Sequence, residues 1–241
     1  MPSTAERKII RKLQVRKHRW QLRRFVAEGP KVVSDLLAAG CRAEMLFSTH
    51  PENYPHPAKA VSAKELAALS QLSSPNQVLG VFHFPQYRAP RQGRVLILDA
   101  INDPGNLGTL IRTADWFGFR QVYCLPGTAD AYGLKCVQST MGSLGRVELI
   151  YASPEEVLPP LANYQFLRAD LPGTELKAWK PQGEKPLALI LGSESHGPSR
   201  FWQERSTALY LPKRSNSPID SLNVATAAAI LMHALCDVDR P

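Results

Sequence analysis

Hydrophobic residues in the first part of the chain follow the spacing of a small α/β unit. Apolar positions at helical spacing predict helices over residues 29–39 and 63–72, and Gly40 is placed to end the first of them. Short apolar runs rich in β-formers predict strands at 44–48 and 77–84. None of these elements carries an obvious cluster of catalytic side chains.

The second part alternates short, nearly continuous apolar runs with helical stretches. Such runs are typical of parallel strands covered on both faces, so a mostly parallel sheet is expected. Ligands of such sheets bind at the carboxyl ends of the strands. The predicted strands are 94–101, 121–125, 147–152, 164–169, 187–191 and 208–211, and an apolar helix is expected over 224–236.

A polar stretch with two prolines, 85–93, separates the two parts and has the composition of a linker. We therefore predict two domains, 1–90 and 91–241.

The positive charge of the chain is concentrated at one end. Ten of the 29 Lys and Arg residues, but only two of the 21 Asp and Glu residues, lie within residues 1–31, so this segment alone accounts for the net charge of +8. A basic face of this kind attracts a polyanion such as RNA. The aromatic side chains of Trp20 and Phe25 are candidates for stacking on bases, and the alternative is a solvated helix whose apolar residues pack inward.

Composition excludes several other classes of protein. No run of about 18 apolar residues and no signal-peptide core is present, so we expect a cytoplasmic protein that does not enter a membrane. The four cysteines form no C-x-x-C pair, which argues against a zinc site and a disulfide framework, and we expect no metal.

Three loops carry the candidate chemistry. The first follows a predicted strand and opens a helix, with Asn106 near the helix start, where it is a candidate cap, and Arg112 six residues later. The second, 192–197, follows another strand and contains Glu194. The third precedes the last helix and contains Ser221, a candidate helix cap, and Asn223. Neither G-x-G-x-x-G nor a P-loop is present.

Taken together, these three segments resemble the SpoU (TrmH-like) family of RNA 2′-O-ribose methyltransferases, within the SPOUT class. The resemblance covers about residues 94–241 and rests on Asn-x-Gly-x-x-x-Arg at 106–112, Gly-x-Glu at 192–194 and Ser-Leu-Asn at 221–223. The segment 141–147 also looks like a stretch of that family. It implies an α/β fold whose mostly parallel sheet contains a deep trefoil knot. Residues 25–31 resemble the start of the family's small, ribosomal-protein-like α/β domain that binds RNA substrate.

The resemblance also implies a cofactor, partners and roles. The cofactor is S-adenosylmethionine, the substrate is structured RNA, preferentially ribosomal RNA with transfer RNA as the alternative, and the active protein is a homodimer. The residues that it assigns to catalysis are Arg112, Asn106, Glu194, Ser221 and Asn223. Those expected around the cofactor are Gly192, Leu211, Ile219 and Leu222. The expected RNA-binding residues are Arg11, Arg16, Lys17, Arg23, Arg24 and Lys31.

The chemistry expected of this site is alignment and removal of a proton. Guanidinium stays protonated in proteins, so we expect Arg112 to anchor the target phosphate and polarise the ribose hydroxyl while a phosphate oxygen or water takes the proton. His196 is an alternative base. Many family members have glycine after the motif glutamate, and Ser195 stands there in this chain.

Two other functions are compatible with parts of the sequence. A non-catalytic RNA-binding ribosome-assembly factor would use only the basic segment and the first α/β unit. A small-molecule enzyme would leave the charge concentration unexplained. The apolar helix 224–236 is either part of a dimer interface, through Val224, Ala227, Ala228, Leu231 and Leu235, or a core helix.

Overall fold

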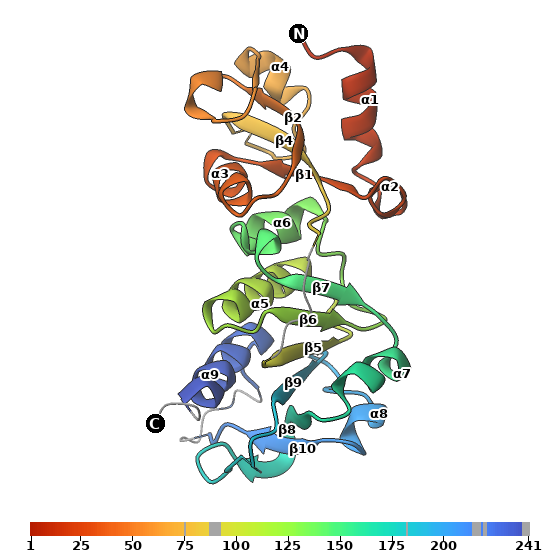
Figure 1. Cartoon of the computed structure of the whole chain (residues 1–241), viewed down its shortest axis with the longest axis vertical. Helices are drawn as coiled ribbons and strands as arrows, with labels where there is room; N and C mark the ends of the chain where they lie inside the picture. Colours follow the sequence, from red (N-terminus) through yellow and green to blue (C-terminus); the bar gives the residue numbers. More distant parts are fainter. Residues whose placement is uncertain (75, 87–92, 182, 214–217, 219–220, 238–241) are drawn as a thin grey trace. The chain divides into compact units, whose positions relative to one another are not determined.

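The computed structural model describes residues 1–241 except 75, 87–92, 182, 214–217, 219–220 and 238–241 (Figure 1). The chain forms two compact units. Unit 1 contains residues 1–88 and 130–146, and unit 2 contains residues 89–129 and 147–241. Most of the predicted linker, at 87–92, lies outside the described residues, and a domain boundary near residue 90 stays a prediction.

Unit 1 contains a four-stranded sheet in the order β1-β4-β2-β3. Strand β4 is antiparallel to both of its neighbours, and β3 is parallel to β2. Residues of α1 and α4 join the strands in one hydrophobic core, which includes Ile10, Leu13 and Leu66. The elements are α1 (Thr4–Lys12), α2 (Arg16–Leu22), β1 (Arg24–Glu28), α3 (Pro30–Ala38), β2 (Ala43–Ser48), η1 (Pro51–Asn53), β3 (Lys59–Ala60), α4 (Ala63–Ala67) and β4 (Val78–His83).

The predicted helix 29–39 and the two predicted strands of this unit are confirmed by α3, β2 and β4. The helix predicted over 63–72 is wrong at its end, because α4 ends at Ala67. The hydroxyl of Ser70 donates to the buried Glu28 carboxylate and accepts from the Leu72 amide at 3.0 Å. This turn leaves the helix path and satisfies a carboxylate whose residue is 1 % exposed.

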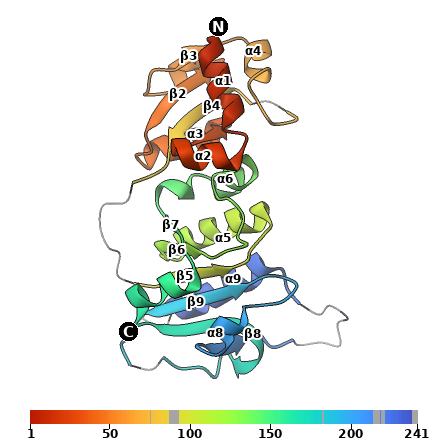
Figure 2. The same ribbon diagram turned by 90° about the vertical axis from the view of Figure 1, so that its right-hand side faces the viewer.

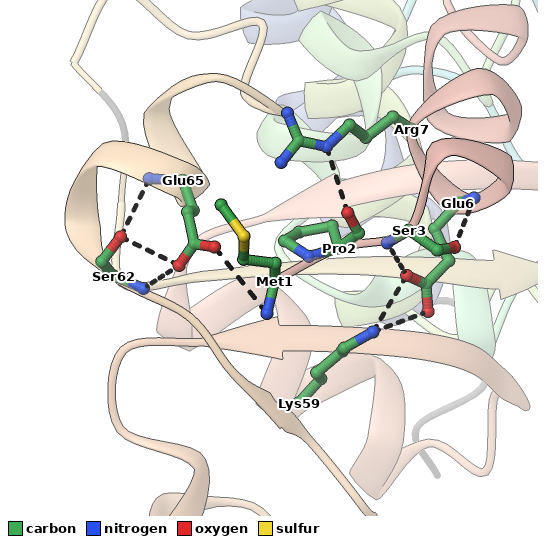
Figure 3. A network of polar contacts seen from close by, with 8 residues as sticks. All are labelled: Met1, Pro2, Ser3, Glu6, Arg7, Lys59, Ser62 and Glu65. Atoms are coloured by element: carbon green, nitrogen blue, oxygen red, sulfur yellow. Dashed lines mark hydrogen bonds and ion pairs between the residues drawn. The ribbon is translucent and has the colours of Figure 1, made fainter.

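Hydrogen bonds and an ion pair at the N-terminus of α1 connect this helix to the rest of unit 1 (Figure 3). Ser3 and Glu6 form a reciprocal cap of α1, with the Ser3 hydroxyl accepting from the Glu6 amide. Lys59 Nζ lies 3.1 Å from Glu6 Oε2 and links the helix to β3. The Ser3 amide, followed by Lys59, lowers the pKa of Glu6 because both stabilise its charged form.

A segment from the middle of the chain completes unit 1. It contains α6 (Leu134–Thr140) and η2 (Ser143–Gly145), which contact β1 and α3 respectively. Gln138 Nε2 donates to the carbonyl of Glu28 at 2.6 Å. The backbone approaches closely at Gly145, where an added Cβ would lie 2.5 Å from Ala39 Cβ. Residues 141–146, most of the segment that looks like a stretch of the family, therefore lie within this unit and pack closely against α3 and the residue that follows it.

Unit 2 contains a six-stranded sheet in the order β10-β8-β9-β5-β6-β7, and every adjacent pair is parallel. The sheet confirms the predicted α/β architecture with a mostly parallel sheet. Its strands are β5 (Val95–Asp99), β6 (Gln121–Cys124), β7 (Glu148–Tyr151), β8 (Gln165–Glu175), β9 (Leu187–Gly192) and β10 (Thr207–Tyr210). Strand β8 is longer than predicted because its second half pairs with β10 after a register shift.

Helices cover both faces of this sheet, which explains why its strands are nearly continuous apolar runs (Figures 1 and 2). On one face, side chains of α7, η3 and α8, including Trp202, pack with β5, β6 and β9. Helices α5 and α9 pack against each other, and α9 contacts β9. These elements are α5 (Pro104–Trp116), α7 (Pro154–Val157), η3 (Pro159–Leu161), α8 (Arg200–Gln203) and α9 (Val224–Asp237).

Of the five apolar residues of the final helix that were expected either in a dimer interface or in the core, three are buried, and Val224 and Ala227 are half-buried. Ala228, Leu231 and Leu235 are at most 1 % exposed and belong to the core of unit 2. They are therefore not available for an interface in this structure. None of the described helices is long and apolar enough to span a bilayer.

Candidate active site

The first loop of the site is shaped by a cap at the start of α5. Asp103, rather than the predicted Asn106, is the N-cap, and its Oδ1 accepts from the Asn106 amide at 2.8 Å. Asn106 is the third residue of the helix. Its side-chain amide is therefore free for contacts beyond its own helix.

The second loop leaves the carboxyl end of β9 and closes on itself. The Gly197 amide donates to the Ser193 carbonyl at 2.9 Å, and the Ser193 hydroxyl accepts from the His196 amide at 3.2 Å. Gly197 has a φ of +64°, the left-handed conformation that glycine adopts without strain. Among the described residues, the non-glycine positions with positive φ are Arg23, Ala100 and Met141, so Ser195 has an ordinary backbone conformation. Serine therefore causes no backbone strain at that position.

Gly192 is required by the close return of this loop. A Cβ at position 192 would lie 1.9 Å from the carbonyl carbon of Gly197 and 2.0 Å from the nitrogen of Pro198. The loop is also tied to the neighbouring strand, because Asp99 Oδ2, at the end of β5, accepts from the Ser199 amide at 2.7 Å. Asp99 is nearly buried. The position of the loop carrying Glu194 therefore depends on both Gly192 and Asp99.

Three side chains from the three loops form a continuous hydrogen-bonded chain. Asn106 Nδ2 donates to Glu194 Oε1, and Asn223 Nδ2 donates to Asn106 Oδ1 at 3.1 Å. Residues 88 and 117 positions apart in sequence thus meet beside the carboxyl ends of β5 and β9. This is the edge at which parallel sheets bind ligands.

The helix cap predicted at Ser221 is instead made by Asn223. Asn223 Oδ1 accepts from the amides of Ala225 at 2.9 Å and Thr226 at 3.4 Å, at the start of α9. One side chain therefore caps the helix with its oxygen and holds Asn106 with its nitrogen. Ser221 is exposed and is not joined to this chain of hydrogen bonds.

The remaining polar candidates lie at the surface. The Arg112 side chain is exposed on α5, and within the described residues it has no hydrogen-bond or ion-pair partner. His196 is exposed, with its Nδ1 2.7 Å from Ser195 Oγ. The structure does not bring Arg112 or His196 into the Asn106–Glu194–Asn223 chain.

The residues predicted to surround the cofactor fall into three groups. Gly192 is buried at the end of β9, and Leu211 is half-buried just after β10. Leu222 exposes 52 % of its surface beside Asn223, which leaves an apolar side chain available to a ligand. Ile219 lies outside the described residues. A buried glycine at a strand end and an exposed apolar residue fit an adenosine group, which needs backbone access on its edge and apolar contact on its faces.

The predicted RNA-binding residues differ in their availability. Arg11, Arg16, Lys17 and Arg23 have exposed side chains. The guanidinium of Arg23 also lies 4.7 Å from the ring centre of Phe84. In contrast, Arg24 pairs with Glu44 at 2.6 Å and Lys31 pairs with Asp35 at 2.8 Å, so these two cations already have acidic partners.

The expectation that Phe25 stacks on a base is wrong. Phe25 is fully buried and packs against Phe82. Trp20 packs edge-on against Phe84 and Tyr132. The inward packing proposed as the alternative for the basic segment is confirmed for Ile10 and Leu13, which are buried in the core. Most cations of α1 and α2 are exposed, but Arg19 is buried.

Two positioning residues, Asp99 and Asp103, were missed from the sequence. Asp103 precedes Pro-Gly, and an aspartate directly before a proline at the first helical position is a recognised helix-start signal. Asp99 is the last residue of an otherwise apolar strand, which was a weaker signal.

Among the described residues, no cysteine joins the Asn106–Glu194–Asn223 chain of hydrogen bonds. None of the four cysteines, all of which lie in the described part of the chain, forms a disulfide, and burial raises the pKa of the Cys41 thiol to about 11. Within the described part of the chain, no three His, Cys, Asp or Glu side chains gather as a metal ion would require.

Comparison with known proteins supplies the family. Residues 93–233 match the model of the SpoU rRNA Methylase family, and residues 6–80 match the MRM3-like substrate binding domain. The chain is 31 % identical over 239 residues to the 23S rRNA (guanosine(2553)-2′-O)-methyltransferase RlmP of Bacillus subtilis, with 93 % of each chain covered.

Solved structures agree over nearly the whole chain. An RNA methyltransferase of the TrmH family from Porphyromonas gingivalis is 34 % identical, with a TM-score of 0.85 and coverage of 97 % of this chain and 98 % of that one. An AdoMet-bound rRNA methyltransferase from Sinorhizobium meliloti is 27 % identical, with a TM-score of 0.83 and coverage of 98 % and 96 %. With its three motif loops joined through Asn106, this chain belongs to the SpoU rRNA methylase family.

Proposed function

We propose that this protein transfers a methyl group from S-adenosylmethionine to a ribose 2′-hydroxyl of ribosomal RNA. The observation that carries the proposal is the hydrogen-bonded chain Glu194–Asn106–Asn223, which joins the three family motifs at the ligand-binding edge of the parallel sheet. Such a site is what a methyltransferase of this family needs to align two substrates.

The cofactor is assigned to the backbone and apolar side chains of the second and third loops. Gly192, Leu211, Ile219 and Leu222 hold its adenosine. When bound, S-adenosylmethionine supplies a methyl group already activated on a sulfonium. The protein then contributes alignment of the ribose hydroxyl and removal of its proton.

Arg112 is assigned to the RNA. Its exposed guanidinium is permanently charged and has no acidic partner among the described residues, so its fork remains available for a phosphate. Asn106 and Glu194 position the ribose, Ser221 and Asn223 complete the pocket, and a phosphate oxygen or water accepts the proton. An Arg112→Lys variant tests the fork, because lysine keeps the charge and loses the planar, two-pronged geometry. Activity near that of the wild type would contradict this role.

Residues 1–90 are assigned as a ribosomal-protein-like domain that binds structured RNA. The match of residues 6–80 to a substrate-binding family and the exposed cations of α1 and α2 support this assignment. The relative RlmP is named for an rRNA target, which favours ribosomal RNA over transfer RNA as the substrate, and an rRNA substrate supports our proposal of a cytoplasmic protein. The deep trefoil knot of residues 91–241 rests on family membership, and the connection from β10 to α9 contains residues outside the described part.

A homodimer is assigned from the same resemblance. On the packed helices α5 and α9, Trp116 exposes 82 % and Ile230 43 % of its surface. Large exposed apolar side chains are candidates for an interface between copies. Sedimentation of the wild type and a Trp116→Ser variant tests this, and an unchanged dimer in the variant would remove Trp116 from the interface.

The central experiment incubates the purified protein with S-adenosylmethionine and with transcripts of 23S rRNA and of transfer RNA. A methylated ribose cannot attack its own 3′ phosphate, so a new site of resistance to alkaline cleavage locates the modification. An Asn106→Ala variant should lose this signal, and an exposed-loop control, Ser195→Ala, should keep it. RNA binding without methyl transfer by the wild type would favour the non-catalytic assembly factor.

A further inference from the structure

Unit 1 contains a buried ion pair, Arg19 with Asp130, that the proposed RNA contacts do not use. Arg19 and Asp130 expose only 9 % and 7 % of their side chains. Both Arg19 Nε, at 2.9 Å, and Nη2, at 2.7 Å, donate to Asp130 Oδ2. Arg19 is therefore neutralised inside the protein and does not belong to the surface that faces RNA.

The second oxygen of Asp130 is also saturated. Its Oδ1 accepts from Trp20 Nε1 and from the Tyr132 amide, both at 3.2 Å. Trp20 and Tyr132 in turn pack edge to face, and Tyr132 stacks on Phe84 with ring centres 3.6 Å apart. The carboxylate thus holds two consecutive residues of α2 against an aromatic cluster.

The guanidinium of Arg19 also reaches the preceding helix. Its Nη1 donates to the carbonyls of Leu13 and Gln14, each at 2.8 Å, just after α1 ends. Carbonyls at the end of a helix carry partial negative charge and lack partners within the helix, so a cation stabilises them. One side chain therefore joins the end of α1, the body of α2 and the carboxylate of Asp130.

These contacts connect a residue from the middle of the chain to the exposed cations. Lys8, Arg11 and Lys12 lie on α1, and Arg16 and Lys17 lie on α2. The angle between two short helices sets the spacing of their cations. Buried pairs of this kind contribute little net stability compared with apolar residues, but breaking one leaves an unpaired charge.

We propose that Asp130 and Arg19 are positioning residues for RNA binding, which hold the cations of α1 and α2 in register with RNA phosphates. The proposal rests on the assignment of these helices to RNA binding. It extends the RNA-binding unit beyond residues 6–80, the part that matches the substrate-binding family, to a residue in the segment 130–146.

The charge of Asp130 alone and its proposed positioning role predict opposite changes in RNA affinity when Asp130 is replaced, so the two can be distinguished. Asp130→Asn removes a negative charge from a unit that binds a polyanion, so without positioning the affinity for RNA should rise or stay the same. With positioning, affinity falls. Loss of two phosphate contacts reduces the slope of log K against log salt by about two and weakens binding roughly 30-fold near 0.15 M salt.

The experiment measures binding of a fluorescein-labelled 23S rRNA transcript by the full-length protein between roughly 50 and 200 mM salt. Glu204→Gln is the matched control, because it makes the same change of acid to amide in an exposed ion pair with Arg200. Lys17→Ala is the comparison for one lost direct contact, with a slope lower by about one. Arg19→Lys retains the pairing charge but loses the fork that reaches Leu13 and Gln14.

The expected result is weaker, less salt-dependent RNA binding by Asp130→Asn and Arg19→Lys, with S-adenosylmethionine affinity and Glu204→Gln unchanged. Hydrogen exchange should accelerate in the amides of α1 and α2 while β1 and β4 stay protected. Wild-type affinity in Asp130→Asn, or unfolding of the whole of unit 1 in both variants, would overturn the proposal. A wild type that binds no RNA would instead overturn the proposed function, and the exchange pattern would still report on the contact.

Discussion

Among the described glycines, Gly192 is the one at which an added Cβ would make the shortest contact, so we expect its replacement to disrupt the site. In Gly192→Ala, the new Cβ would lie 1.9 Å from the Gly197 carbonyl carbon. Carbon atoms pack at about 3.5–4.0 Å, so the loop would have to retreat by roughly 1.5 Å. Both contacting atoms belong to the backbone, so no side-chain rotation relieves the clash.

The retreat has consequences for stability and for activity. Overpacking of this kind costs about 3 kcal/mol, which corresponds to a fall in Tm of roughly 6–12 °C for a chain of this size. The same movement carries Glu194 away from Asn106 and strains the bond between the Ser199 amide and Asp99. A misplacement of about 1 Å costs on the order of 100-fold in rate.

The assay combines thermal unfolding, calorimetric titration with S-adenosylmethionine and methylation of a 23S rRNA transcript. Ser195→Ala serves as the control in the same loop, since its hydroxyl contacts only the neighbouring His196 among the described residues. The reasoning would be refuted by a Gly192→Ala protein that keeps the wild-type Tm and cofactor affinity.

Three further predictions concern other parts of the two units. Asn223→Ala removes the helix cap and should lower the free energy of unfolding by about 1 kcal/mol. Asn223→Asp should keep the cap but remove the donor to Asn106, and its methylation rate should fall roughly tenfold. Equal effects of both variants on stability and rate would contradict the two roles of this side chain. Burial raises the pKa of Cys41 to about 11, so the folded state favours the neutral thiol. The neutral thiol should contribute roughly 2 kcal/mol to the free energy of unfolding below about pH 9, and this contribution should disappear as the pH rises through 11. Denaturant unfolding of a Cys41→Ala control should not show this loss. Gly142→Ala should destabilise unit 1 by about 2–4 kcal/mol, because φ is +83° and the new Cβ would lie 2.4 Å from Asp35 Cβ. An unchanged midpoint of urea unfolding would contradict this prediction and show that the contact relaxes.

Much of unit 2 was predictable because its strands are buried on both faces. All six of its strands were located from apolar runs, and burial on both faces is the physical reason that such runs are continuous. The three motif loops were also found, since their residue types and spacing are local features. Their assignment to one site came from the resemblance to the SpoU family, and it agrees with the rule that ligands bind at strand ends.

Local patterns failed where two residues competed for the same local role. Asn106 and Ser221 were both good candidates for helix caps, yet Asp103 and Asn223 make the caps. The difference of three residues between Asp103 and Asn106 decides whether the Asn106 side chain caps its own helix or contacts Glu194. Propensity alone does not separate these possibilities, because Asn, Asp and Ser are all good helix caps.

The sequence by itself determined the parallel α/β architecture of unit 2, the family motifs and the concentration of charge at the N-terminus, since each follows from residue types and spacing along the chain. Only the tertiary structure decided that Arg19 is a buried partner of Asp130, that Phe25 is core, and that residues 130–146 complete unit 1. These outcomes depend on contacts between segments far apart in sequence. Burial and charge pairing change the role of a side chain without changing its local pattern.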